Sequence, residues 1–215
     1  MGPVRSWSVV VPAKRLDVAK TRLRPLTAGR EDAREVHREL VLALLADTVA
    51  AALACPAVGA LLVVTDDVAA ASVASGLGAR VVADEPDRGL NAALEHGVRS
   101  APGPAVAALS SDLPALRAEE LAGALAAAGE VTRAFVADAQ GTGTTLLTAV
   151  GGELRPRFGS GSAGAHLAGG AVALTGAWPG LVHDVDTEAD LRAALRLGTG
   201  ARTAGLVERL AGTGR

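Results

Sequence analysis

Residues 9–24 read Val-Val-Val-Pro-Ala-Lys-Arg-Leu-Asp-Val-Ala-Lys-Thr-Arg-Leu-Arg. The β-branched run predicts a buried strand, Trp7–Val11, which Pro12 ends. Five cations follow, and they include Lys14 and Lys20, the only lysines among 21 lysines and arginines. A lysine ammonium meets a phosphate as a compact, rotatable point charge, whereas an arginine forms a planar fork. The stretch therefore predicts either a strand that delivers a loop to a polyanion or a basic surface turn.

Apolar runs of strand length alternate with helical patterns through most of the chain. The further predicted strands are Ala60–Thr65, Arg80–Ala83, Ala105–Leu109, Ala134–Ala137, Thr145–Val150, Ala171–Thr175 and Leu181–Val185. The predicted helices are about Glu31–Leu53, Val68–Leu77, Leu90–Arg99, Ala118–Ala128 and Asp190–Leu197, the last preceded by a capping box at Thr187–Asp190. Apolar strands separated by helices indicate a mainly parallel sheet covered on both faces. We expect one α/β domain over residues 1–215.

Composition narrows the class of protein. The chain has 215 residues, 49% of them apolar, a formal net charge of −2 and 2% aromatic residues with no tyrosine. It therefore lacks the basic surplus and the stacking platforms of nucleic-acid binders. The single cysteine, Cys55, cannot form an internal disulfide and is interpreted as a small buried hydrophobe. We expect a cytoplasmic protein with no nucleic-acid partner and no membrane association.

Carboxylates follow two of the predicted strands. Asp112 comes just after Ala105–Leu109, and Asp184 and Asp186 flank Val185 at the end of Leu181–Val185. In parallel sheets ligands collect at the carboxyl ends of the strands, where carboxylates from two strands together hold Mg²⁺ and nucleotide phosphates. The alternatives are a turn or N-cap aspartate at Asp112 and a solvated strand end at Asp184 and Asp186 that leads into the helix cap.

Two glycine-rich segments are candidates for anion-binding loops. They are Gly141–Thr145, before a strand, and Arg155–Gly164, some distance after one. Glycines let backbone N–H groups turn toward an anion, and hydroxyls and arginines complete such a pocket. A dinucleotide motif is rejected for the second segment, because its glycines do not directly follow a strand, and a plain surface loop remains an alternative. No Gly-Lys pair occurs, which excludes a P-loop.

Asn91 and the histidines are weaker candidates. Asn91, in a Gly-Leu-Asn turn into a helix, presents an amide and a helix N-terminus to a base or phosphate, or else is an ordinary capping residue. His37, His96, His166 and His183 are scattered without metal-ligand spacing and are interpreted as incidental.

In this order the segments resemble a known family. They are Val-Pro-Ala-Lys14, Ala-Lys20-Thr-Arg22-Leu, Gly-Leu-Asn91, Ser-Asp112-Leu-Pro, Gly-Thr-Gly-Thr144, Arg-Phe-Gly159 with Ser162, and Asp184-Val-Asp186-Thr. The family is the CofC/FbiD guanylyltransferases of deazaflavin coenzyme F-420 biosynthesis, and the resemblance covers nearly the whole chain. It implies a single-domain nucleotidyltransferase fold, glycosyltransferase-A-like and Rossmann-related, and an enzyme that transfers GMP from GTP to a three-carbon phospho-acid, releasing pyrophosphate.

The resemblance also implies a role for each matching residue. Lys14, Lys20 and Arg22 would hold the triphosphate, with Asn91 also on the nucleotide, and Lys14, Lys20 and Asp112 would serve catalysis. Asp112 and Asp184 would bind the Mg²⁺ cofactor. Thr144, Gly159 and Ser162 would hold the acceptor, although Gly161 offers little side chain in that loop.

The implied chemistry needs no protein nucleophile, because the acceptor's phosphate is already an anion. Mg²⁺ and the lysines would neutralise the negative charges of this phosphate and of the GTP phosphates that it attacks. Acceptors in the family are phosphoenolpyruvate, 2-phospho-L-lactate and 3-phospho-D-glycerate. The Arg- and Ala-rich composition is typical of actinobacteria, where the family's acceptor is typically phosphoenolpyruvate, so the resemblance implies that acceptor first and 2-phospho-L-lactate second. The resemblance further implies coupling to the next enzyme of the pathway. The alternatives are an enzyme of the same fold acting on a sugar phosphate or molybdopterin, and a non-catalytic nucleotide-binding regulator.

Overall fold

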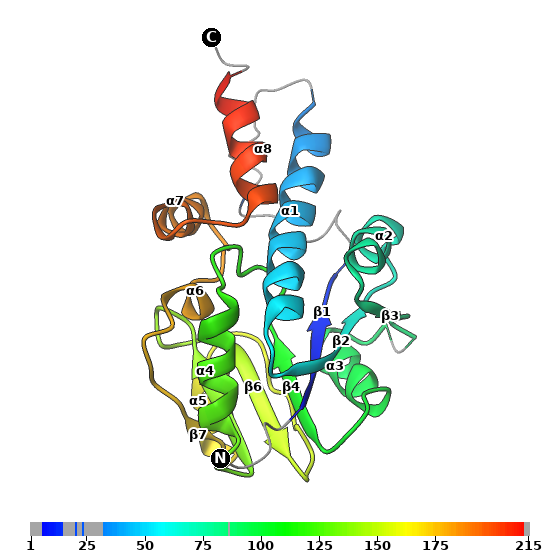
Figure 1. Ribbon diagram of the computed structural model, residues 1–215, viewed down its shortest axis with the longest axis vertical. Coiled ribbons are helices and arrows are strands. Elements are labelled where there is room, and N and C mark those ends of the chain that lie inside the picture. Colours follow the sequence, from blue (N-terminus) through cyan, green and yellow to red (C-terminus); the bar gives the residue numbers. More distant parts are fainter. Residues whose placement is uncertain (1–5, 15–19, 21–22, 24–31, 86, 213–215) are drawn as a thin grey trace.

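The computed structural model describes residues 6–14, 20, 23, 32–85 and 87–212. Its centre is a seven-stranded sheet in the order β3-β2-β1-β4-β6-β5-β7 (Figure 1). The strands are β1 (Trp7–Pro12), β2 (Val58–Val64), β3 (Arg80–Val82), β4 (Ala105–Leu109), β5 (Arg133–Ala137), β6 (Thr144–Val150) and β7 (Val172–Ala173). All neighbouring strands are parallel except β6, which runs antiparallel to β4 and β5. The predicted mainly parallel, mixed α/β sheet is confirmed.

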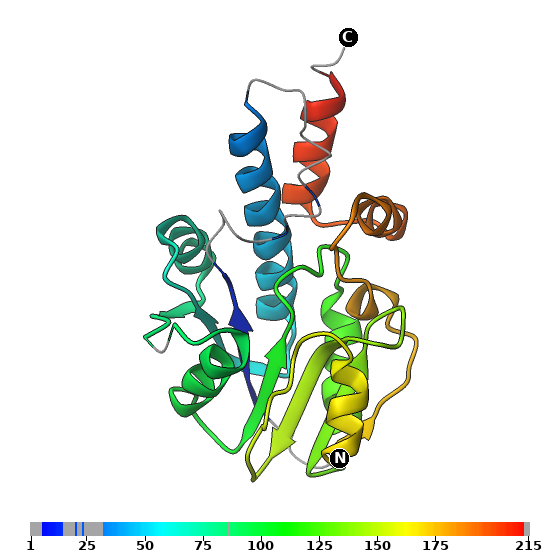
Figure 2. The same ribbon diagram turned by 180° about the vertical axis from the view of Figure 1, so that it is seen from behind.

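Helices cover both faces of this sheet, as Figures 1 and 2 show from opposite sides. They are α1 (Ala33–Ala54), α2 (Val68–Leu77), α3 (Leu90–Arg99), α4 (Ala118–Ala128), α5 (Ser162–Ala168), α6 (Pro179–Val182), α7 (Glu188–Leu197) and α8 (Ala201–Gly212). Helices α1 and α4 lie on one face, and α3 and α5 lie on the other. Four predicted spans match the structure at both ends: Val68–Leu77, Leu90–Arg99, Ala105–Leu109 and Ala118–Ala128.

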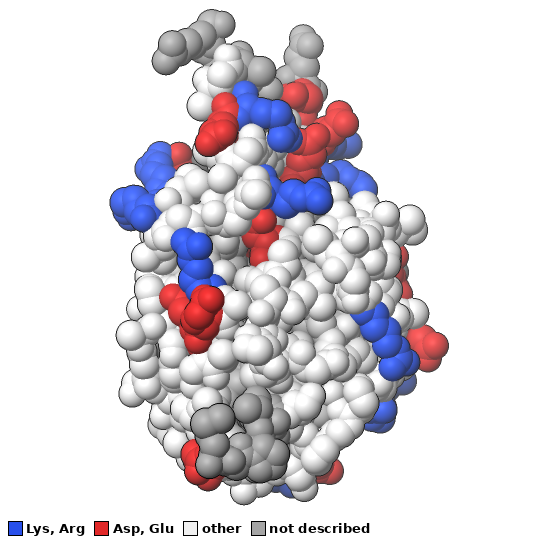
Figure 3. Space-filling view, in the orientation of Figure 1, with Lys and Arg blue, Asp and Glu red and all other residues white. Residues whose placement is uncertain are grey.

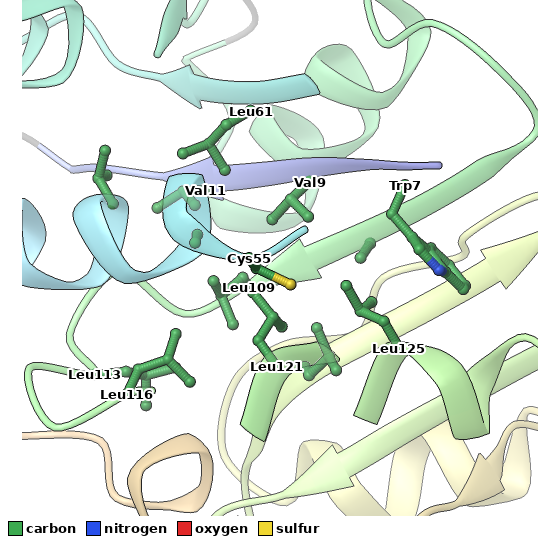
Figure 4. Close-up of a cluster of buried hydrophobic side chains, with 14 of the residues drawn as sticks. Trp7, Val9, Val11, Cys55, Leu61, Leu109, Leu113, Leu116, Leu121 and Leu125 are labelled. Carbon is green, nitrogen blue, oxygen red and sulfur yellow. The ribbon is translucent and has the colours of Figure 1, made fainter. Parts of the chain in front are cut away.

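The alternation of β1 explains why both faces are covered. Val9 and Val11 point into the core beneath α1 and α4, together with Trp7 and Cys55 (Figure 4). Val10 points the other way, into a second core that includes residues of α3 and α5. Because successive side chains of a strand face opposite sides, a strand that is apolar throughout must be buried on both. Cys55 is a buried free thiol, as expected, and burial raises its pKa.

Close packing of α3 against the sheet depends on a glycine. A Cβ atom at Gly97 would lie 2.5 Å from Val10 Cγ1 and 2.6 Å from Val64 Cγ2. These separations are too short for any side chain, so α3 approaches β1 and β2 only because position 97 is glycine. The close approach fixes the N-terminal end of α3, with Asn91, beside the carboxyl ends of these strands.

One predicted strand is wrong. Leu181–Val185 was expected to be a strand, but Pro179 begins the short helix α6, and residues 183–186 follow without regular structure. A short apolar run does not distinguish a strand from a buried helical turn, and proline favours the first turn of a helix. Helices α5 and α8 were not predicted. The capping box at Thr187 is confirmed: its side chain accepts from the backbone N–H of Asp190, whose carboxylate accepts from that of Thr187.

Helix α8 packs beside the N-terminal half of α1 to form a third core cluster, which includes Leu40, Leu44, Leu191 and Leu206 (Figures 1 and 2). Figure 3 shows charged side chains of both signs gathered over this end of the molecule, with fewer over the rest of that face. Among the described residues, no helix combines the length and the apolar character needed to cross a bilayer.

Candidate functional site

The candidate residues gather at one edge of the sheet. The carboxyl ends of β1 and β4 lie at this edge, and β6, being antiparallel, brings its amino end to the same place. The backbone N–H of Ser110, just after β4, donates to the Thr145 carbonyl at 2.8 Å. This bond ties the segment that carries Asp112 to the start of β6, which carries Thr144.

Lys20 links two of the expected carboxylates. Its ammonium donates to Asp112 and to Asp186, and only 18% of its side chain is exposed. The backbone N–H of Val185 donates to the Asp112 carbonyl at 3.0 Å, which holds the irregular segment 183–186 against the β4 loop. The site thus joins residues about 70 positions apart without the strand that the sequence predicted.

The pKa shifts describe an excess of negative charge balanced by Lys20. Burial raises the pKa of Asp184 to about 7, and the carboxylates of Asp112, Asp186 and Asp138 add to this while Lys20 opposes it. Burial disfavours the charge on Lys20, but Asp112 and Asp186 outweigh it and raise the pKa of the ammonium. Within the described residues no three His, Cys, Asp or Glu side chains are arranged to hold a metal by themselves.

A buried hydroxyl cluster lies beside the carboxylates. Thr144 Oγ1 is 3.2 Å from Ser162 Oγ and 2.9 Å from His166 Nδ1. The other ring nitrogen of His166, Nε2, accepts from the backbone N–H of Arg157 at 2.9 Å. Burial lowers the pKa of His166 to about 4, and the positive charges of Arg133 and Arg157 lower it further. His166 is therefore neutral at physiological pH.

The first glycine-rich segment does not offer its backbone to an anion. The N–H groups of Thr142 and Gly143 both donate to the Asp138 carboxylate at 2.8 Å, and the Gly141 N–H donates to the Asp138 carbonyl. The expectation of an anion loop is wrong for 141–143, because an aspartate at the start of the turn takes these donors. In the second segment Gly159 and Gly161 have φ values of 136° and 72°, which favour glycine.

Asn91 holds the second segment in place. Its amide donates to the Phe158 carbonyl at 3.1 Å, and its side-chain oxygen accepts from the Phe158 N–H at 2.8 Å. Helix α3 is in fact capped at Gly89 without a side-chain hydrogen bond, so Asn91 is not the capping residue. One amide hydrogen and one lone pair of Asn91 remain for other contacts.

A cavity of about 290 Å³ opens at the ends of β1 and β2. Lys14 lines it, together with Asp66, Asp84 and Asp87 and with Gly89 and Leu90 at the start of α3. The Asp84 backbone N–H donates to Asp66 Oδ1 at 2.9 Å. Asp84 Oδ1 is buried and has no hydrogen-bond partner among the described residues.

The structure thus divides the predicted residues among four places. Lys20 lies with the aspartates, Thr144 lies with Ser162, Lys14 lines the cavity, and Asn91 binds Phe158, the residue next to Gly159. Arg22 lies outside the described residues.

Sequence reasoning missed Asp138 and His166. Asp138 carried a signal, since an aspartate that precedes a glycine-rich turn is a common acceptor for the turn's backbone N–H groups, here those of Thr142 and Gly143. His166 carried none, because its partners are distant in the sequence or are backbone atoms.

Solved structures with the same architecture define the class. A nucleotidyl transferase from Methanothermobacter matches with a TM-score of 0.64 and 24% identity, covering 89% of this chain and 97% of that one. A putative nucleotide-diphospho-sugar transferase from Desulfovibrio desulfuricans matches with a TM-score of 0.70 and 18% identity, covering 96% of each chain. The chain therefore has the fold of a nucleotidyltransferase.

Sequence comparison identifies the family. The family described as "Guanylyl transferase CofC like" matches residues 7–211. A phosphoenolpyruvate guanylyltransferase from Geodermatophilus obscurus is 69% identical over 207 residues, 96% of each chain, and one from Salinispora arenicola is 53% identical over 201 residues, 92% of each chain. The protein belongs to the CofC-like guanylyl transferase family, which confirms the resemblance seen in its motifs.

Proposed function

We propose that this enzyme transfers GMP from GTP to phosphoenolpyruvate and releases pyrophosphate, as a step in coenzyme F-420 biosynthesis. One observation carries the structural part of the proposal. In this chain, which belongs to the guanylyl transferase family, the Lys20–Asp112–Asp186 cluster lies beside the Thr144–Ser162 hydroxyl pair at one edge of the sheet. The acceptor is supported by the names of the relatives from Geodermatophilus and Salinispora.

The donor set fits a magnesium ion held by Asp112 and Asp184. Mg²⁺ prefers hard oxygen ligands and is commonly bound by one or two carboxylates together with substrate phosphates, so a third protein ligand is not required. The raised pKa of Asp184 reflects crowded negative charge that a divalent cation would relieve. When bound, Mg²⁺ would withdraw negative charge from the GTP phosphates at the reacting end.

The protein's own contribution is to bring two anions together. Lys20 keeps a positive charge at the carboxylate cluster, and Lys14 adds a second, exposed one at the cavity. Thr144, Gly159 and Ser162 bind the acceptor and hold its phosphate for in-line attack on the α-phosphorus. Asn91 fixes the backbone next to Gly159 and so sets the position of this loop. No protein nucleophile is used, because the acceptor phosphate is already ionised.

We place the guanosine part of GTP in the cavity beside Lys14. Guanine presents an imino hydrogen and an amino group side by side, and a carboxylate accepts hydrogen bonds from both, whereas adenine presents an acceptor at the corresponding ring nitrogen. Three residues of the lining, Asp66, Asp84 and Asp87, carry carboxylates and so suit guanine in this respect.

Pyrophosphate release tests the proposal directly. The purified protein is incubated with GTP, Mg²⁺ and, separately, phosphoenolpyruvate, 2-phospho-L-lactate or 3-phospho-D-glycerate, with the next pathway enzyme added as a trap for the unstable product. We expect release with phosphoenolpyruvate. Release with none of the acids, or only with a sugar phosphate, would contradict it, and GTP binding without any release would indicate a non-catalytic regulator.

Asp112→Asn is the matched variant for this assay. We expect turnover to fall at least about 100-fold, because a metal and phosphate site loses a charged ligand, while the melting temperature changes little. Glu39→Gln serves as the control, since it makes the same carboxylate-to-amide change at an exposed pair with Arg209 between α1 and α8 and has no contact with the site. Near-normal turnover of Asp112→Asn would remove this residue from the metal site.

A further inference from the structure

His166 is enclosed by groups that fix both of its nitrogens. Only 2% of the residue is exposed, and the rings of Phe158 and Phe135 lie against it with centroids at 5.3 Å and 5.9 Å. Nε2 lies 2.9 Å from the backbone nitrogen of Arg157, and Nδ1 lies 2.9 Å from Thr144 Oγ1. The imidazole therefore bridges the loop that precedes Gly159 and the first residue of β6.

These partners determine the tautomer. A backbone N–H only donates, so the Arg157 bond requires an unprotonated Nε2. The neutral ring then carries its hydrogen on Nδ1, and this N–H donates to Thr144 Oγ1. Ser162 Oγ donates to the same oxygen at 3.2 Å. Since both lone pairs of Thr144 Oγ1 are engaged, its own hydrogen is left to donate elsewhere.

The direction in which the Thr144 hydroxyl points its hydrogen decides whether it can bind an anionic ligand. An anionic ligand is bound by donors and repelled by lone pairs. With the opposite tautomer, the Thr144 hydroxyl would donate to Nδ1 and turn a lone pair toward any ligand. The Nδ1–H tautomer instead leaves Thr144 as a ready donor.

We propose that His166 is a positioning residue for the acceptor substrate: it holds the Thr144 hydroxyl as a hydrogen-bond donor to an anionic oxygen of the phospho-acid, and it anchors the loop before Gly159 through the Arg157 N–H. This rests on the proposed function, which places the acceptor at Thr144. His166 itself does not touch the reacting atoms. It acts through the two groups that it orients.

Two amide variants separate the hydrogen bond that His166 donates to Thr144 from the one that it accepts from the Arg157 N–H. His166→Gln places a side-chain oxygen near the position of Nε2 and keeps an acceptor for the Arg157 N–H, but it loses the donor to Thr144. His166→Asn places an amide nitrogen near the position of Nδ1 and keeps the donor to Thr144, but it loses the acceptor. We expect His166→Gln to raise the KM for phosphoenolpyruvate about tenfold with the KM for GTP within about twofold, and His166→Asn to change the acceptor KM less.

Thr144→Val distinguishes failure of this inference from failure of the proposed site, because it removes the hydroxyl and keeps the shape. If Thr144→Val raises the acceptor KM and His166→Gln does not, the positioning role is overturned while the acceptor site stands. If neither variant changes it, the acceptor site itself is wrong. An equal rise in both KM values for His166→Gln would indicate a purely structural histidine and would also overturn the proposal.

A spectroscopic measurement tests the tautomer independently of activity. Long-range ¹H–¹⁵N spectra of the histidine rings in the intact protein distinguish a protonated Nδ1 from a protonated Nε2. We expect the His166 signals to show hydrogen on Nδ1 at pH 7.5, with the assignment made by their loss in His166→Gln. Hydrogen on Nε2 would contradict the hydrogen-bond direction on which the proposal depends.

Discussion

Lys14 and Lys20 lie in different surroundings although only five residues separate them. Lys14 is exposed at the cavity, whereas Lys20 is largely buried against Asp112 and Asp186. Removing Lys14 therefore removes the contact that we propose it makes to GTP. Removing Lys20 also leaves two carboxylates facing each other without their cation.

Substitution of each lysine should separate these effects. We expect Lys14→Ala to raise the KM for GTP about tenfold with little change in melting temperature, because an exposed charge contributes little to folding. Lys20→Ala should lower activity more strongly, and Mg²⁺ should raise its melting temperature more than that of the wild type. Steady-state kinetics and thermal melts with and without Mg²⁺ measure both. Arg192→Ala, which removes an exposed pair with Glu188 on α7, is the control. Full activity of both lysine variants would contradict a role of Lys14 and Lys20 in GTP binding and would favour the alternative of a basic surface turn.

The buried His166 should make stability depend on pH. Burial and the nearby Arg133 and Arg157 lower its pKa to about 4, whereas the unfolded chain protonates the ring near pH 6.5. The unfolded state thus binds a proton between these values that the folded state does not. The stability from His166 is complete above about pH 6.5 and falls by up to about 3 kcal/mol as the pH drops toward 4.

Urea unfolding at pH 7.5 and pH 5 checks this. We expect the stability advantage of the wild type over His166→Asn to shrink at pH 5, because groups common to both proteins cancel in the comparison. An unchanged advantage would show that His166 titrates normally in the folded protein.

Among the elements, α8 depends on one aspartate of α1. Asp47 is buried and accepts from the backbone N–H groups of Arg202 and Thr203 at 3.1 Å and 2.8 Å, in the first turn of α8. These donors have no partner within their own helix, and a carboxylate at a helix N-terminus is favoured by the helix dipole. A Cβ atom at Gly200 would lie 2.4 Å from the Asp47 carboxyl carbon, so the chain passes close to this side chain.

Asp47→Ala should therefore lower the free energy of unfolding by about 2 kcal/mol, since it leaves the buried N–H of Thr203 and the partly buried N–H of Arg202 without an acceptor. Turnover should be retained, because Asp47 has no part in the proposed site. Glu39→Ala is the matched control: it removes an exposed ion pair with Arg209 between the same two helices and should change stability by at most about 0.5 kcal/mol. Denaturant unfolding of both variants measures the difference, and equal effects would contradict the capping role.

At the scale of the whole molecule, the proposed site joins segments that are far apart in the chain. The described residues that contribute include Lys14, Lys20, Asp84, Asn91, Asp112, Thr144, Phe158, Ser162, His166, Asp184 and Asp186. Ligand that binds only the folded arrangement stabilises the whole domain. We expect GTP with Mg²⁺ at 100 times its dissociation constant to add about 2.7 kcal/mol and to raise the melting temperature by about 5 to 10 °C.

The thermal shift has two controls. GTP with a chelator in place of Mg²⁺ should give a smaller shift, and so should GTP with Mg²⁺ on the Asp112→Asn protein. An equal shift in all three conditions would show that the metal and Asp112 do not take part in nucleotide binding.

The sequence by itself determined the architecture and the membership in the family. β4 is apolar throughout, and so is the run Val9–Val11 in β1; that pattern requires a sheet covered on both faces, so the mainly parallel α/β fold was predictable. The order of Lys14, Asn91, Asp112, Thr144 and Asp184 along the chain carried the resemblance that the family match confirms.

The tertiary structure alone decided how the polar groups are used. The segment that carries Asp184 and Asp186 was expected to be a strand, yet it is irregular and is held by the Asp112 carbonyl. The N–H groups of the turn at residues 142–143 donate to Asp138, and the side-chain amide of Asn91 donates to the Phe158 carbonyl. His166 became visible as part of the site only through Thr144 and Arg157. Hydrophobic periodicity is a local property that sequence displays, whereas a hydrogen bond between distant residues depends on where the packed core places their backbones.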